Sequence, residues 1–479
     1  MSVRVRFAPS PTGYLHIGGA RTCLYNYLYA KKMGGKLIIR VEDTDLERSS
    51  REFEDSQMND LRWLGIEWDE GPGKDGEFGP YRQSERVEIY KNYATQLLEE
   101  GKAFYCFCTD EELEAMREKA LAENRDPIYD GTWRDFPLEE AKKKIAAGEK
   151  ASIRFIAPLK DYSFTDEVRG DVTFPQGMVG DFVIMRSNGM PTFNFCVVVD
   201  DVLMKITHVI RGEDHLNNMV RQLMIYEALK AEKPKFAHVS LLIGHDRQKL
   251  SKRHGATSVS QYREQNYLPE AMNNYLCLLG WSHPEEKDIF TKEEIANIFD
   301  LKRFSKSAAL YDVEKLKWVN GQHLKSYDAA EIAKMFSHSK SEEVLKFFLP
   351  QSDEWKNEFV SLFLEKVQTL EDYIPFLTDI FTSKLNLMDD AKEVLTWETT
   401  PIVKKVVSDE LAKLTDDYMS KEDLSSLMDI LKKEHKVKGK NLFMGLRVVL
   451  TGLCHGSDLT RLIPLTPLNV IKKRVESLG

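Results

Sequence analysis

Residues 3–45 constrain the fold most, because a strand-like pattern, a helix-like pattern and a second strand-like pattern follow one another there. Apolar Val3, Val5 and Phe7 alternate with arginines, which is the period of a strand. A helix-like run covers residues 20–33, and an apolar strand follows at 37–39. Strand, helix and strand at this spacing predict a right-handed parallel unit and an α/β fold.

The loop between the first strand and the helix is a candidate ligand-binding segment, because ligands bind beyond the carboxyl ends of parallel strands. It contains Pro9, Ser10, Thr12 and Gly13, and it leads to His16 at the start of the helix. A helix start offers free N–H groups and a positive dipole end, which favour phosphate. His16 is then expected to point a ring N–H at a phosphate oxygen, although a helix-start histidine without any function is an equal alternative.

Gly18 and Gly19 stand in the first turn of the same predicted helix. Each lowers intrinsic helix stability by up to about 1 kcal/mol relative to alanine. This loss indicates that something packs close to the backbone at this turn.

A second candidate segment, "LLIGHDRQKLSKRHGATSV", follows a later apolar strand. Between Gly244 and Gly255 it carries several cations, among them Lys249 and Lys252. Cations on a glycine-flanked loop suit a clamp on polyphosphate, where they stabilise the charge that grows on leaving pyrophosphate. A solvated surface loop is the alternative for this segment taken alone.

Together, "PSPTGYLHIGG" and "KLSKR" resemble the two signature motifs of class I aminoacyl-tRNA synthetases. More narrowly, "RVEDTD", "WLGIEWDEGP", "THVIRGEDHL" and "LRVVLTG" follow in the order typical of bacterial-type glutamyl-tRNA synthetases, so that the resemblance covers essentially the whole chain. Gly19 and Leu250 stand where the related glutaminyl enzymes have His and Met, which favours the glutamyl branch.

The resemblance implies a glutamate–tRNA ligase, which activates L-glutamate with ATP and transfers it to the 3′-terminal adenosine of tRNA(Glu). Charging of tRNA(Gln) as well, or a glutaminyl-tRNA synthetase, are the alternatives that stay open. A small nucleotidyltransferase would have no use for the long helical C-terminal region. A tRNA-binding protein that has lost catalysis would not need His16, Glu42, Arg211 and Lys252.

The resemblance also implies roles for individual residues. The catalytic set is His16, Lys249 and Lys252, which stabilise phosphate charge. The ATP-binding set is Pro9, Ser10, Thr12, Gly13, His16, Gly18, Gly19, Leu250, Ser251, Lys252 and Arg253, and Mg²⁺ is expected on the phosphates. The glutamate-binding set is Arg6, Ala8, Ser10, Glu42, Phe193 and Arg211, in which arginine forks suit carboxylates and Glu42 receives the ammonium group.

Two positions depart from the pattern of the relatives. Phe193 in "PTFNF" stands where many relatives have tyrosine, so a polar contact with substrate at that position is in doubt. Cys106 and Cys108 supply only two of the four ligands that a structural zinc site needs, so we expect no zinc and no other protein-bound metal.

The fold class that we predict is α/β: a class I, Rossmann-like, parallel-sheet catalytic domain with an α+β insertion, followed by an all-helical anticodon-binding region. The predicted domains are 1–105 (catalytic, first half), 106–205 (inserted, acceptor-binding), 206–325 (catalytic second half and stem contact) and 326–479 (all-helical, two subdomains). In the insertion, residues 109–127 read as a charged helix, and 151–158, 161–174 and 181–201 read as strand-rich, with a hairpin turn at 187–189.

Composition sets the remaining expectations. No apolar run approaches the length of a membrane span or of a signal peptide, and the scattered cysteines form no disulfide framework, so we expect a cytoplasmic protein without membrane contact. The net charge is −9, with the excess acid in the first 300 residues, so a nucleic-acid footprint has to be local. The lysine run at 432–440 is the best candidate. The family leads us to expect a monomer, and the residues that read the anticodon stay open.

Overall fold

The computed structural model describes residues 2–251, 255 and 257–478, and the chain divides into two compact units. The first unit holds the chain up to Glu264 together with Pro269–Val313. The second unit holds Gln265–Leu268 and the chain from Glu314 onward.

The division falls earlier than the domain boundary predicted after residue 325. Helix α11 (Val313–Leu324) belongs almost wholly to the second unit. Asn320 of this helix accepts a hydrogen bond from the backbone N–H of Leu268 at 2.8 Å and donates one to the carbonyl of Gln368 at 2.6 Å. These bonds join segments that are distant in the chain, which local sequence patterns do not reveal.

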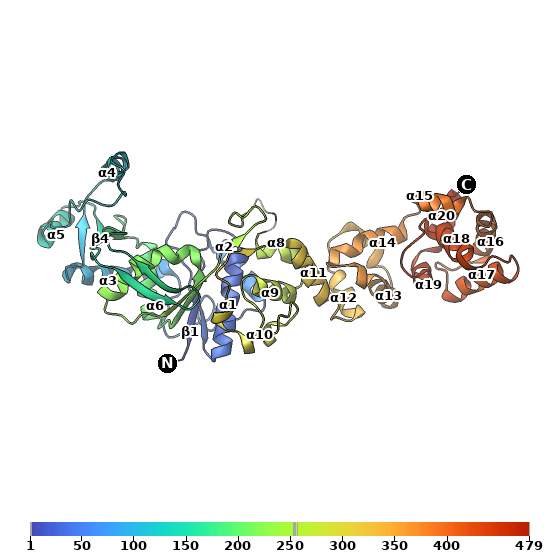
Figure 1. Cartoon of the computed structure of the whole chain (residues 1–479), viewed down its shortest axis with the longest axis horizontal. Coiled ribbons are helices and arrows are strands. Elements are labelled where there is room, and N and C mark those ends of the chain that lie inside the picture. Colours follow the sequence, from blue (N-terminus) through green and yellow to red (C-terminus); the bar gives the residue numbers. More distant parts are fainter. Residues whose placement is uncertain (1, 252–254, 256, 479) are drawn as a thin grey trace. The chain divides into compact units, whose positions relative to one another are not determined.

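In the described part of the first unit, six strands form one sheet, in the order β2 (Lys36–Ile39), β1 (Arg4–Phe7), β8 (His208–Gly212), β9 (Lys235–Val239), β5 (Tyr162–Asp166) and β6 (Gly170–Phe174). Neighbouring strands run parallel, except that β5 and β6 form an antiparallel hairpin. Helix α1 (Ile17–Met33) connects β1 to β2, which confirms the predicted strand–helix–strand unit (Figure 1).

The β5–β6 hairpin adds to this six-stranded sheet, although the sequence placed residues 161–174 in the inserted region. Strand β5 pairs in parallel with β9, with Asp166 opposite Phe236. Pairing between strands so far apart in the chain is a tertiary contact, and a local strand pattern carries no signal for it. The insertion therefore contributes directly to the sheet that carries the candidate site.

The rest of the insertion forms a small antiparallel sheet of β3 (Ala103–Cys106), β4 (Ser152–Phe155) and β7 (Phe182–Met185), with helices α4 (Asp110–Ala122) and α5 (Leu138–Ala146). In Figure 1, α4 and α5 lie at the same end of the first unit as β4. The predicted turn follows β7, where the N–H of Arg186 donates to the carbonyl of Met190 at 2.8 Å.

Residues 193–203 form a helix, α6 (Phe193–Leu203), so the predicted strand there is wrong. The three valines at 197–199 suggested a strand, but they are at most 2% exposed, and the helix packs against α7 (Met219–Ala228) within the core. A short apolar run that is buried on every side has no periodicity by which a strand and a helix can be told apart.

The remaining elements of the first unit pack around the sheet or cover its edges. They are α2 (Arg51–Trp63), α3 (Val87–Glu99), α8 (Val259–Glu264), α9 (Pro269–Leu278), α10 (Lys292–Ile298), the short strands β10 (Leu242–Ile243) and β11 (Ala309–Leu310), and the 3₁₀ turns η1 (Gln83–Arg86), η2 (Glu213–Asn218) and η4 (Leu301–Arg303). Helix α1 packs on α9 and α10, where the buried Tyr25 hydroxyl donates to the carbonyl of Leu279 at 2.8 Å.

The second unit is helical, as predicted for the chain beyond residue 325. Its elements are α12 (Ala329–Phe336), the π-helical turn η5 (Val344–Phe348), α13 (Asp353–Phe363), η6 (Leu364–Lys366), η7 (Leu370–Asp372), α14 (Tyr373–Phe381), α15 (Asp389–Leu395), α16 (Thr400–Lys413), α17 (Lys421–Lys433), α18 (Gly439–Thr451), α19 (Leu459–Leu462), η8 (Ile463–Leu465) and α20 (Leu468–Ser477).

Two kinds of core hold these helices together. Stacked and edge-on rings, including Phe336, Phe359 and Tyr373, fill the earlier part, and aliphatic side chains such as Leu446 and Ile471 fill the later part. Within the described residues, no helix combines the length and the apolar character needed to cross a membrane.

Gly35, in the turn between α1 and β2, gives a test of how tightly the first unit is packed. A Cβ added there would lie 2.3 Å from the carbonyl oxygen of Val3, so the backbone would have to shift. We expect Gly35→Ala to lower the free energy of unfolding by about 1–3 kcal/mol, measured by urea unfolding. The matched control is Gly13→Ala, where an added Cβ meets nothing within 4 Å. A change of less than about 1 kcal/mol is expected for the control, and an equal effect of the two variants would contradict the packing described.

Candidate active site

A cleft of about 500 Å³ lies where β1 and β8 end and α1 begins. The predicted site residues that line it are Arg6, Ala8, Ser10, His16, Gly18, Gly19, Glu42, Phe193, Arg211, Lys249 and Leu250. Among the described residues, Pro9, Thr12, Gly13 and Ser251 do not line it. Lys252 and Arg253 lie outside the described residues, so their roles stay predictions.

His16 occupies the N-cap of α1, and its ring orientation is determined by the helix itself. The backbone N–H of Gly18 donates to its Nδ1 at 3.1 Å, so the proton of the neutral ring is on Nε2. Burial and then the charge of Lys249 lower the pKa of His16, which keeps the ring neutral. His16 therefore offers an Nε2–H donor to a ligand in the cleft.

The two glycines of the first turn lie beside His16 and the cleft. A Cβ at Gly18 would lie 3.4 Å from Nδ1 of His16, and one at Gly19 would lie 3.4 Å from Leu15 and 3.6 Å from Phe7. These are ordinary van der Waals distances, so the protein's own packing does not require glycine at either position, and both residues line the cleft.

The second candidate segment begins as a tight hairpin. The N–H of Leu250 donates to the carbonyl of Leu242 at 2.9 Å, and the N–H of Gly244 donates to the carbonyl of Gln248 at 2.9 Å. Arg247 turns the chain with a φ of 60°. This hairpin brings Lys249 and Leu250 to the wall of the cleft.

The same segment returns to pair with the start of α1. The N–H of Ile17 donates to the carbonyl of Thr257, and the N–H of Val259 donates to the carbonyl of Leu15, each at 2.9 Å. The chain before and after the undescribed residues 252–254 is thus attached at the cleft, beside His16. Two segments that are far apart in sequence converge on one site.

Lys249 is the described cation of this second segment that lines the cleft. Its ammonium group forms a 2.8 Å ion pair with Asp214, and the lysine side chain is 64% exposed. Exposed ion pairs of this kind contribute about 0–1 kcal/mol, so the lysine can exchange this partner for a phosphate at little cost.

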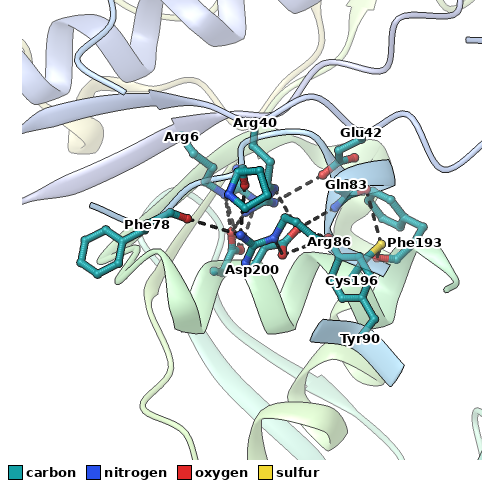
Figure 2. A network of polar contacts seen from close by, with 12 residues as sticks. Arg6, Arg40, Glu42, Phe78, Gln83, Arg86, Tyr90, Phe193, Cys196 and Asp200 are labelled. Atoms are coloured by element: carbon teal, nitrogen blue, oxygen red, sulfur yellow. Dashed lines mark hydrogen bonds and ion pairs between the residues drawn. The ribbon is translucent and has the colours of Figure 1, made fainter. Parts of the chain in front are cut away.

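Arg6 and Glu42 lie on neighbouring strand ends and share a buried polar network with Arg40 (Figure 2). Asp201 of α6 joins them: its Oδ1 lies 3.2 Å from Nε of Arg6 and 2.6 Å from Nη1 of Arg40. Arg40 also contacts Oε1 of Glu42 at 3.4 Å. Asp201 bridges the guanidinium groups of Arg6 and Arg40 and so holds Arg6 in place. Its single negative charge does not neutralise both arginines.

Burial raises the pKa of Glu42 to about 7, against the opposing charges of Arg40 and then Arg6. The backbone N–H of Glu42 donates to the carbonyl of Pro9 at 2.9 Å, which ties the two loops together. Glu42 is therefore a carboxyl group that changes charge near neutral pH and lines the cleft.

Asp200, the neighbour of Asp201, anchors the same network from below (Figure 2). It accepts hydrogen bonds from Nε of Arg86 at 2.7 Å, from the Tyr90 hydroxyl at 2.9 Å and from Nε2 of Gln83 at 2.9 Å. Asp200 is fully buried, so every one of these bonds forms away from water.

Arg211, at the end of β8, is the second arginine of the cleft and is also buried. Its Nη2 donates to Oε1 of Gln222 at 2.8 Å, and its Nε donates to Nε2 of His238 at 3.1 Å. Burial, with the charge of Arg6 added, lowers the pKa of Arg211 to about 10, which leaves it a cation at neutral pH.

Phe193 stands at the start of α6 with its ring 5.4 Å from that of His215. Burial and the charge of Arg211 lower the pKa of His215 to about 4, so its ring is neutral. The wall of the cleft formed by Phe193 and His215 is therefore uncharged, and its polar atoms come from the histidine.

Sequence reasoning missed several residues of the site: Arg21, Arg40, Val197, Asp200, Asp201, Asp214, His215 and His238. The paired aspartates at the end of a valine run were the one available signal, because buried carboxylates require partners. Which arginines they meet depends on tertiary contacts.

Cys106 and Cys108 lie around one tyrosine hydroxyl, with sulfur–oxygen distances of 3.6 and 3.9 Å to Tyr129. Among the described residues, no group of three or more His, Cys, Asp or Glu side chains is arranged to hold a metal ion. The absence of zinc stays a prediction.

Two family models match the chain: tRNA synthetases class I (E and Q), catalytic domain, over residues 2–318, and anticodon binding domain, over residues 323–477. The chain is 46% identical to glutamate–tRNA ligase 1 of Caldicellulosiruptor saccharolyticus and 44% identical to the glutamate–tRNA ligase of Bacillus subtilis. Each alignment covers 99% of both proteins.

A solved structure agrees with these matches. The crystal structure of a glutamate tRNA ligase from Elizabethkingia meningosepticum in complex with its amino acid superposes with a TM-score of 0.89 at 33% identity. The match covers 100% of this chain and 99% of that one.

The buried contacts of Asp200 lead to a prediction for the free energy of unfolding. Asp200→Ala would leave Arg86 buried without its carboxylate, so we expect the free energy of unfolding to fall by about 3–5 kcal/mol, measured by urea unfolding. The control is Glu114→Ala, which removes an exposed ion pair with Arg117 and is expected to change it by less than about 1 kcal/mol. Similar losses in both variants would mean that the buried network does not stabilise the fold.

Proposed function

Because the chain belongs to the family of class I tRNA synthetases for glutamate and glutamine and is a glutamate–tRNA ligase, we propose that its cleft joins L-glutamate to ATP and then to tRNA(Glu). The observation that carries the proposal is the convergence of a buried arginine pair, Glu42 and His16 on one cleft. The residue roles below are part of the proposal.

Glutamate brings two carboxylates and one ammonium group to the cleft. The guanidinium groups of Arg6 and Arg211 bind the carboxylates, and Glu42 binds the ammonium group. Buried charge-assisted hydrogen bonds of this kind are stronger than neutral ones, and the surrounding network holds the donors before the substrate arrives. Ala8 and Ser10 line the same part of the cleft and complete its wall.

ATP binds over the start of α1. The Nε2–H of His16, the first-turn N–H group of Gly19 and the ammonium of Lys249 provide donors and positive charge for the phosphates, while the N–H of Gly18 holds the His16 ring. Lys252 is expected to add a further cation. Mg²⁺ is expected to enter on the phosphates themselves, because no group of three or more His, Cys, Asp or Glu side chains among the described residues is arranged to hold a metal ion.

Activation needs positioning and charge stabilisation rather than a protein nucleophile. An oxygen of the α-carboxylate attacks the α-phosphorus, and the bond to the bridging oxygen breaks, so that pyrophosphate leaves with the electron pair. His16 and the lysines stabilise the charge that grows on the leaving group. The 2′-hydroxyl of the terminal adenosine then attacks the acyl carbon and releases AMP together with a proton.

The helical second unit is proposed to bind the anticodon arm, and the inserted region the acceptor end. Parts of the lysine run at 432–440 are engaged within the unit: Lys433 pairs with Asp429 at 2.7 Å, and Lys440 lies over the ring of Trp397. Lys432 lies over the Phe443 ring, and Lys436 donates to the carbonyl of Lys433 at 2.8 Å. The lysines of this run are candidate phosphate contacts. A cytoplasmic monomer completes the proposal.

The test is ATP–pyrophosphate exchange and tRNA charging with glutamate or glutamine, on tRNA(Glu) and tRNA(Gln). Glutamate-dependent charging of tRNA(Glu) is expected. Charging with glutamine would instead favour a glutaminyl enzyme, and no exchange with or without tRNA would overturn the proposal.

Arg211→Gln is expected to raise KM for glutamate by about tenfold to a hundredfold, because a charged hydrogen bond is lost. The control is Arg221→Gln, whose guanidinium lies over the Phe182 ring, outside the cleft.

The raised pKa of Glu42 predicts that KM for glutamate depends on pH. Its carboxyl group is protonated below a pKa of about 7 in the free protein, and only the carboxylate binds an ammonium group. KM for glutamate should therefore be about tenfold higher at pH 6 than at pH 8. His215, with a pKa lowered to about 4, does not titrate in this range. Glu42→Gln should raise KM and flatten the profile, and a slope that survives this substitution would assign the titration to another group.

A further inference from the structure

His238, which contacts Arg211, presents a single tautomer to the guanidinium group. His238 lies on β9, opposite Arg211 in the parallel register of β8 and β9, and it is 0% exposed. Nε of Arg211 lies 3.1 Å from Nε2 of His238. A guanidinium group has only donors, so Nε2 of the histidine must be the acceptor and carry no proton.

The contact of the other ring nitrogen, Nδ1, explains why Nε2 of His238 carries no proton. Nδ1 of His238 lies 2.6 Å from Oδ2 of Asp166, and a carboxylate only accepts, so Nδ1 carries the proton. Asp166 is held in turn by the N–H groups of Val168 and Arg169, each at 2.9 Å, and by that of His238 itself. A buried carboxylate therefore determines the tautomer of the ring.

The surroundings keep the ring neutral. Burial lowers the pKa of His238, and the charges of Arg211 and Arg6 add to this, while the hydrogen bond to Asp166 opposes it. The neighbouring ring of His215 is neutral as well. A protonated His238 would turn a donor toward the Nε–H of Arg211, and the contact would be lost.

Arg211 is thereby bound on the side away from the ligand. Nε is engaged by His238, and Nη2 by Gln222 at 2.8 Å and by the sulfur of Met219 at 2.9 Å. Gln222 is oriented by Asn194, to which its Nε2 donates at 3.0 Å. In the described part of the chain these contacts leave Nη1 for a ligand.

We propose that Asp166 and His238 are positioning residues for glutamate: Asp166 sets the tautomer of His238, which in turn aims the guanidinium of Arg211 at a substrate carboxylate. The inference rests on the proposed function, in which Arg211 binds that carboxylate. It makes the β5–β6 hairpin of the insertion part of the amino-acid site, because Asp166 ends β5.

Asp166→Asn tests this directly. The amide oxygen can keep the backbone bonds of the turn, but the amide N–H₂ then faces Nδ1 and requires it to accept. The ring proton moves to Nε2 and opposes the Nε–H of Arg211. KM for glutamate should rise by about tenfold or more, while kcat and KM for ATP stay within about twofold. Asp181→Asn, a buried aspartate of the same inserted region that bonds Arg134 and the backbone of Ala157, is the matched control and should change none of them.

A second variant separates the tautomer from a structural role. His238→Gln offers an amide oxygen to Arg211 and has no tautomers, so it should bind glutamate better than His238→Leu. In the His238→Gln background, Asp166→Asn should change KM by less than about twofold, because the group on which Asp166 acts is gone. An undiminished effect in that background would make Asp166 a structural residue and overturn the inference.

The wild-type protein provides the readout if Asp166→Asn does not fold. In a ¹⁵N-histidine spectrum, assigned through His238→Gln, the ring should carry its proton on Nδ1 with Nε2 unprotonated. A proton on Nε2 would overturn the inference. Absence of glutamate-dependent charging in the wild type would instead overturn the proposed function, so the two failures are distinct.

Discussion

The site depends on the backbone pairing between residues 15–17 and 257–259. Together with the hairpin that joins Leu250 to Leu242, these bonds attach the lysine-bearing segment to the start of α1, so that the helix N-terminus, His16 and Lys249 line one cleft. Without them the first segment would be a helix start and the second a surface loop. Chemistry that relies on positioning and charge rather than on a nucleophile needs both at one place.

A network of buried hydrogen bonds and ion pairs lies next to that cleft and holds its side chains in place. Asp200 and Asp201 are adjacent on α6 and form ion pairs with Arg6, Arg40 and Arg86. Asp166 contacts His238, which in turn accepts a hydrogen bond from Arg211. Burial strengthens these contacts and makes each unpaired group costly, so the loss of one partner destabilises the others strongly. The network thus holds the guanidinium groups of Arg6 and Arg211 at the wall of the cleft.

The sequence predicted the parts of this site that local pattern encodes. The strand–loop–helix of residues 3–33, the cations around Lys249 and the glutamate-binding candidates Arg6, Glu42 and Arg211 stand next to strand ends in the chain itself. It did not predict that residues 161–174 extend the sheet, nor that 193–203 are helical, because strand partners and burial on all sides are tertiary properties. His238 and Asp166 were missed for the same reason: each is unremarkable until folding places it beside the other.

The most direct measurement is hydrogen exchange with and without a non-hydrolysable analogue of glutamyl-adenylate, read by mass spectrometry. If both segments close over one nucleotide, peptides covering residues 13–22 and 242–259 should gain protection together, along with those around Arg6 and Arg211. Protection of the first segment with none in the second would contradict a shared site.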